Sequence, residues 1–136
     1  MPQYVIAYIA TVIVFLGIDF VWLTRVASGF YTAQLGDLLL ENPRLGPAAV
    51  FYLFYVVGIV FFAVMPALNG GGLPVALVSG ALLGAIAYAT YDVSNYATLK
   101  NWPAVVVVVD IIWGAVLTAV SAAAGWWITR MISSVG

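Results

Sequence analysis

The chain has 136 residues, of which 65% are hydrophobic and only 7% are charged, and its formal net charge is −1. An ordinary soluble domain is about 25% charged, so this composition excludes a soluble protein and predicts an integral membrane protein. The sequence contains no Cys and no His, which excludes disulfides, thiolate chemistry and the usual ligands of zinc and haem. Because it has no basic cluster either, we expect no nucleic-acid partner, no metal and no cofactor.

The first apolar stretch predicts a membrane-spanning helix over residues 4–24, about the length that crosses a hydrocarbon core. It lacks the positive start and the small-residue cleavage site of a signal peptide, so we expect it to be retained. Asp19 lies near the end of this helix, flanked by Phe20 and Trp22. Arg25 closes the stretch as an interfacial anchor.

The segment that follows, residues 28–46, is too polar to span a membrane. Tyr31, Leu35 and Leu38 fall at helical spacing, opposite Asp37. This pattern favours a short amphipathic helix lying in the membrane interface, and an ordered loop is the alternative.

Three further apolar stretches predict helices over residues 47–65, 75–97 and 103–128. An uncharged sequence, NGGGLP at residues 69–74, predicts a tight turn between the first two of them. The sequence therefore predicts an all-α membrane protein with a single transmembrane domain (1–136), a bundle of four transmembrane helices.

Two local features concern how these helices end and pack. Pro66 is expected to help end the helix over residues 47–65. Gly80 and Gly84 form a small-xxx-small motif that lets a neighbouring helix approach closely, and the same helical face continues to Tyr88 and Asp92. The last helix also carries a face of small and polar residues, namely Asp110, Gly114, Thr118, Ser121, Ala122 and Gly125.

The positive charges predict the orientation in the membrane. Arg25, Arg44 and Lys100 fall in the two connections that share one side, whereas Arg130 lies on the other side with both termini. The positive-inside rule then places both termini outside the cytoplasm.

Three acids are expected in one leaflet. Asp19, Asp92 and Asp110 each lie roughly 7–9 Å from the middle of the membrane, at 1.5 Å per helical residue. Carboxylates this close in a low dielectric repel one another, so a proton or a cation is expected among them. The alternative is that a buried polar network only holds helices together. Polar and aromatic neighbours complete the predicted ligand-binding site: Trp22, Tyr52, Tyr55, Tyr88, Tyr91, Asn95 and Trp113.

Four stretches carry a resemblance to a known family: IDFVWL, PAAVFYLFY, AYATYDVSNYATLKNW and VVVDIIWG. With them the chain resembles, over nearly its whole length, a bacterial family of predicted membrane proteins that is a domain of unknown function. The resemblance implies a small, multi-pass protein of the bacterial inner membrane with four spans, and its termini are then periplasmic. It assigns no catalytic residue.

The polar site supports three hypotheses of function. The first is a binding or enzyme site for a lipid, isoprenoid or small amphiphile, with aromatic walls and with Asp92 and Asp19 or Asp110 as an acid–base pair. The second is a proton- or cation-coupled transporter or channel, working as a homo-oligomer. The third is a non-catalytic membrane subunit whose acids only pack helices. The sequence leaves open whether the protein is an enzyme.

Overall fold

The computed structural model describes residues 3–39 and 44–135, and these residues form helices and short turns without a strand. The part of the predicted interfacial segment at residues 40–43 lies outside the described residues. An all-α fold is therefore confirmed for the described part of the chain.

The first helical arm is longer than predicted. α1 (Gln3–Val21) continues through the π-helical η1 (Trp22–Ala27) into α2 (Ser28–Leu35) and the short 3-10 helix η2 (Gly36–Leu38). The helix therefore continues past the predicted span end at residue 24, and the segment for which a short helix was predicted is helical in α2 and joined to α1 without a break. Since the sequence from Ile18 to Ser28 contains no Gly or Pro, nothing in it interrupts the helix.

The second arm begins with α3 (Leu45–Ile59) and continues through the π-helical η3 (Val60–Val64). It then passes through Pro66, whose φ of −59° and ψ of −35° are helical, so the prediction that Pro66 helps end this helix is wrong. Proline fits a helical φ, and both the N–H bond that it lacks and the clash of its ring with the preceding turn fall here on a π-helical turn, in which the hydrogen bonding is already irregular.

The chain reverses a few residues later, in η4 (Ala67–Gly71). Asn69 has φ −90° and ψ 27°, and Gly70 has φ 117°, a conformation that glycine adopts without steric cost. The predicted turn is thus present, and α4 (Gly72–Thr98) runs back from it. A second turn, with Asn101 at φ 63°, leads into α5 (Ala104–Val135), which extends beyond the predicted end at residue 128.

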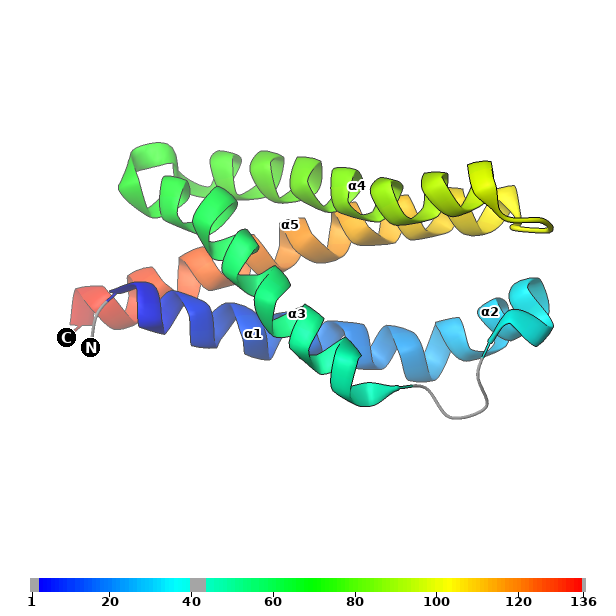
Figure 1. Ribbon diagram of the computed structural model, residues 1–136. Coiled ribbons are helices and arrows are strands. Elements are labelled where there is room, and N and C mark those ends of the chain that lie inside the picture. The colour runs from blue at the N-terminus through cyan, green and yellow to red at the C-terminus, as the bar shows by residue number, and fades with distance from the viewer. Residues whose placement is uncertain (1–2, 40–43, 136) are drawn as a thin grey trace.

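Among the described residues, three helical segments are long and apolar enough to cross a membrane: Gln3–Leu38, Leu45–Thr98 and Ala104–Ser133. The second contains the reversal at Asn69 and Gly70, so the three segments consist of four apolar arms. In Figure 1 the start of α1 and the end of α5 lie at the same end of the molecule as the turn between α3 and α4. The connection between α4 and α5 lies at the opposite end, together with α2.

The glycine face of α4 packs on α5, as predicted. A Cβ added at Gly80 would lie 2.9 Å from the Cα atom of Ala119, and one at Gly84 would lie 2.7 Å from the carbonyl carbon of Gly114. Both distances are shorter than Cβ atoms tolerate, so the two helices touch through their backbones. This close contact fixes the depth of Asp92 relative to Asp110.

Two further contacts bring α1 and α3 onto the same core. Gly125 of α5 lies against Thr11 of α1, since a Cβ added there would lie 3.3 Å from the Thr11 Cβ. The Phe15 ring lies 5.7 Å from the rings of both Tyr52 and Tyr55 of α3. Every arm also carries large apolar side chains that point outward, such as Ile13 (66% exposed), Phe54 (75%), Val78 (67%) and Ile112 (59%). Such a surface suits contact with lipid.

Candidate functional site

Asp19 of α1 is the first of the three acids in the chain, and its carboxyl contacts side chains from two other helices. The Nε1–H of Trp113, on α5, donates to the Oδ1 atom of Asp19 at 3.3 Å, and the Tyr52 hydroxyl of α3 lies beside the same carboxyl. Asp19 itself is 5% exposed. The Trp113 ring stacks on Trp22 with a centroid distance of 4.2 Å and an interplanar angle of 11°. The predicted neighbours Trp22, Tyr52 and Trp113 therefore gather around this acid.

Asp92 and Asp110 lie next to each other across the interface of α4 and α5. Asp92 is 1% exposed, and Asp110 is partly buried. The Tyr31 hydroxyl, from α2, donates a hydrogen bond to the Oδ1 atom of Asp110. Tyr31 was predicted to lie on a short interfacial helix or in an ordered loop, and its contact with Asp110 was not predicted.

Two tyrosines of α4 connect the acidic positions. The ring of Tyr88 lies against Gly114, and its hydroxyl is within electrostatic range of both Asp19 and Asp110. The Tyr91 hydroxyl is within electrostatic range of Asp92 and Asp110, and the Asn95 side chain lies beside it. Tyr88 and Tyr91 thus lie between the surroundings of Asp19 and the pair formed by Asp92 and Asp110.

Tyr55 differs from the other predicted site residues. Its hydroxyl is hydrogen-bonded to the Thr118 Oγ1 atom at 2.9 Å, so its bond partner is a hydroxyl on α5 and not an acid. This bond links α3 to α5, so helix packing alone explains why the Tyr55 hydroxyl is buried.

One carboxylate oxygen and one indole N–H in this region lack partners. The Oδ1 atom of Asp92 and the Nε1 atom of Trp102 are both buried without a hydrogen-bond partner among the described residues. The Trp102 indole and the Asp110 carboxyl nevertheless both lie within hydrogen-bonding reach of the Asp92 side chain. The Trp102 ring meets the Tyr91 ring edge-on with centroids 5.8 Å apart. Trp102 was not predicted as a site residue. The sequence could have indicated it, because Trp102 lies at the end of the polar stretch that contains Asp92 and Asn95.

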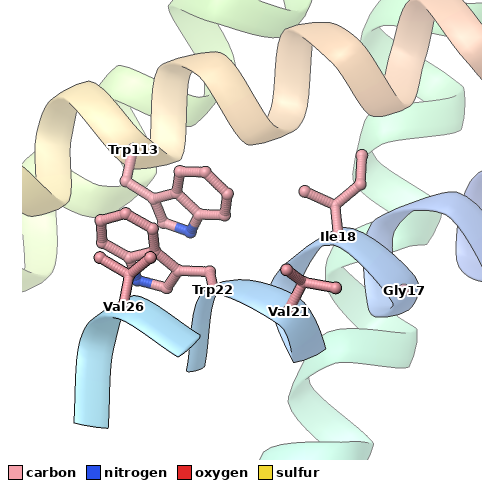
Figure 2. A pocket seen from close by; sticks show the side chains of 6 residues that line it. All are labelled: Gly17, Ile18, Val21, Trp22, Val26 and Trp113. Atoms are coloured by element: carbon pink, nitrogen blue, oxygen red, sulfur yellow. The ribbon is translucent and has the colours of Figure 1, made fainter. Parts of the chain in front are cut away.

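An open apolar groove lies between the first arm and α5, beside the stacked tryptophans (Figure 2). Its volume is about 400 Å³. A second hollow of about 200 Å³, lined by Val109 and Ile112 among others, lies along the same tryptophan pair. The residues that line the groove are Gly17, Ile18, Val21, Trp22, Val26 and Trp113.

No group of three or more Asp or Glu side chains that could hold a metal ion occurs in the described residues. What the arrangement offers is a set of carboxylates and hydrogen-bond donors next to an apolar groove. Such a combination of apolar walls and a few polar groups is typical of small-molecule sites.

The fold and this polar region define a multi-pass helical membrane protein. Residues 4–127 match the family model described as a predicted membrane protein (DUF2177), and the chain belongs to this family. No curated protein and no solved structure shows a significant match to the chain.

Proposed function

We propose that the protein binds a membrane lipid or a small amphiphile, with its tail in the groove and its head group at the acidic region. The observation that carries this proposal is the double role of Trp113. Its ring lines the apolar groove, while its Nε1–H is bonded to Asp19. One side chain therefore separates an apolar surface from a polar one, as a site for an amphiphile requires.

The charges of the region limit which head groups would be accepted. Asp19, Asp92 and Asp110 are all acidic, and no Lys or Arg neighbours them among the interactions seen in the described residues. An anionic head group would meet like charge without a compensating cation, so neutral and cationic head groups are favoured.

The groove allows a direct test of the tail site. A Cβ at Gly17 meets nothing within 4 Å and Gly17 lines the groove, so Gly17→Leu places an apolar side chain at the groove. A Cβ at Gly58 on α3 also meets nothing within 4 Å, and it lies outside the groove, so Gly58→Leu is the matched control.

The probe is a single-chain amphiphile with a neutral head and a brominated tail, because bromine quenches nearby tryptophans. In lipid nanodiscs we expect saturable quenching for the unmodified protein and for Gly58→Leu, and loss of the saturable part for Gly17→Leu. Quenching that rises without saturation in the unmodified protein would mean ordinary partition into lipid and would refute the proposal.

The adjacency of Asp92 and Asp110 supports a second candidate, proton-coupled transport. Two carboxyls side by side can share one proton, and intramembrane acids commonly mark proton pathways. Proton uptake into liposomes that contain the protein, and its loss in Asp110→Asn, would support this candidate. Liposomes with no uptake above empty ones would remove it.

The charge distribution supports one orientation in the membrane. We propose that the protein lies in the bacterial inner membrane with both termini in the periplasm. Arg25, Arg44 and Lys100 would then lie on the cytoplasmic side.

A further inference from the structure

Two hollows adjoin the stacked tryptophans, and both tryptophans line each of them. The groove of about 400 Å³ follows the first arm, and the second hollow of about 200 Å³ follows α5. Trp22 reaches into the space between these elements from η1, and Trp113 reaches into it from α5 (Figure 2). The stacked rings therefore form a bridge with one apolar hollow toward each element.

The two hollows run side by side along their helices. The lining of the groove extends from Gly17 to Val26, and that of the second hollow extends from Val109 to Val116. At 1.5 Å per residue, these stretches are about 14 and about 11 Å long. Because both hollows include the same two rings, they lie at the same depth, and they follow helices that cross the membrane. Lipid chains have this same direction.

The helix geometry of the first arm is irregular at this place. Trp22 and Val26 both lie in η1, a π-helical stretch that no Gly or Pro between Ile18 and Ser28 accounts for. Such π-helical turns are frequent at functional sites. Val26 is 52% exposed and Val116 is 50% exposed, so both hollows are open to the surrounding lipid.

We propose that the amphiphile bound here is a two-chain lipid of zero net charge, with one chain in the groove and the other in the second hollow. This inference rests on the proposed binding of an amphiphile and specifies its chemical class. Once one chain is bound, the chain joined to it meets the other hollow at a high effective concentration, so joined chains bind more tightly than separate ones. A transmembrane helix is about 10 Å wide with its side chains, so it would insert only single side chains into hollows of this size.

Charged residues at one end of the two hollows fit a zwitterionic head group. Arg25, which is exposed, precedes Val26 in the chain, and Asp110 follows Val109 on the opposite helix. Both pairs lie toward the end of the molecule that carries α2 and the turn between α4 and α5, since the first arm and α5 run in opposite directions (Figure 1). A cation and an acid thus face a head group that carries a phosphate and an ammonium.

Two probes with the same head group separate one chain from two: phosphatidylcholine and lysophosphatidylcholine with identical acyl chains. Their binding to the full chain is measured by displacement of the tail-brominated amphiphile, which restores tryptophan fluorescence. The protein is held in micelles of a steroid glycoside detergent, because such a detergent has no acyl chain that competes for the hollows. We expect phosphatidylcholine to displace the amphiphile at a mole fraction about tenfold or more lower than lysophosphatidylcholine.

One variant assigns this preference to the second hollow. Val116→Phe places a larger apolar side chain there, so it should weaken phosphatidylcholine about tenfold, leave lysophosphatidylcholine in the groove, and bring their ratio near one. Val120→Phe is the matched control, because it makes the same change one turn further along α5, at 44% exposure and outside both linings. It should leave the ratio unchanged.

The two probes already decide the matter in the unmodified protein. If the brominated amphiphile saturates but the two lipids displace it equally or not at all, the two-chain assignment fails and the proposed function stands. A Val116→Phe variant that keeps the full ratio would also overturn the inference. So would light scattering that shows a dimer which Val116→Phe separates into monomers, because a second copy would then occupy the hollows. If the brominated amphiphile itself does not saturate, the inference and the proposed function fail together.

Discussion

Adding one methyl group at Gly84 should separate the two helices that carry Asp92 and Asp110. In Gly84→Ala the new Cβ would overlap the Gly114 carbonyl oxygen and lie 2.8 Å from the Thr118 Oγ1 atom. Because the obstacle is backbone, no side-chain rotation relieves it, and α4 must move away from α5. Overpacking of this kind costs about 1–3 kcal/mol. The shift also strains the bond between Thr118 and Tyr55, which is worth about 0.6 kcal/mol in a membrane.

Thermal unfolding in detergent measures this cost. For a chain of this size we expect the Tm of Gly84→Ala to fall by about 5 °C or more. Gly58→Ala is the control, since a Cβ there meets nothing within 4 Å and the change of helix propensity is the same. Equal melting temperatures for the two variants would show that α4 and α5 do not touch at Gly84, and the placement of the acids would have to be revised.

Three further predictions concern the polar region and the orientation. Tyr31→Phe removes the donor to Asp110 and should cost about 1–2 kcal/mol in thermal unfolding, whereas Tyr96→Phe, at an exposed site, should leave the Tm unchanged. Asp19→Asn keeps an acceptor for Trp113 and should shift the Tm little, and a large loss would show that its charge is needed for folding. Reporter fusions at the C-terminus and in the turn at Gly70–Gly72 should both report the periplasm, and cytoplasmic signals from both would invert the orientation.

The features that were predicted correctly depend on short stretches of sequence. The turn at Asn69 and Gly70 follows from residues that tolerate unusual backbone angles. The packing face of Gly80 and Gly84 follows from helical periodicity and the need for small residues at close helix contacts. Both signals are local, so no knowledge of the tertiary structure was needed.

The errors came from treating local composition as if it decided where a helix ends. The segment from Ser28 is polar, but polarity does not break a helix, and the chain continues in helical conformation to Leu38. Pro66 was expected to help end a helix, yet its own backbone angles are helical, and the chain reverses direction only at Asn69 and Gly70. A polar segment and a proline were each taken as the end of a helix, although the helix continues past both.

The candidate site, too, could be predicted from the sequence only in part. That Asp19, Asp92 and Asp110 share one region could be expected from their depth in three helices. The bond between Tyr31 and Asp110 could not, because these residues are 79 positions apart and meet only through the uninterrupted first arm. The neighbourhood of Trp102 and Asp92 likewise depends on how the turn after α4 folds back.

The distribution of hydrogen bonds separates a packing role from a binding role among the three acids. Asp19 accepts a bond from Trp113, and Asp110 accepts one from Tyr31, so each ties helices together and needs no ligand to explain it. Asp92 is the most deeply buried of the three, yet its Oδ1 atom has no partner among the described residues. If the acids only held helices together, the most buried one should have the best bonds, because unpaired burial is destabilising. Asp92 is therefore the acid whose hydrogen bonding is least complete, although Asp110 and Trp102 lie beside it.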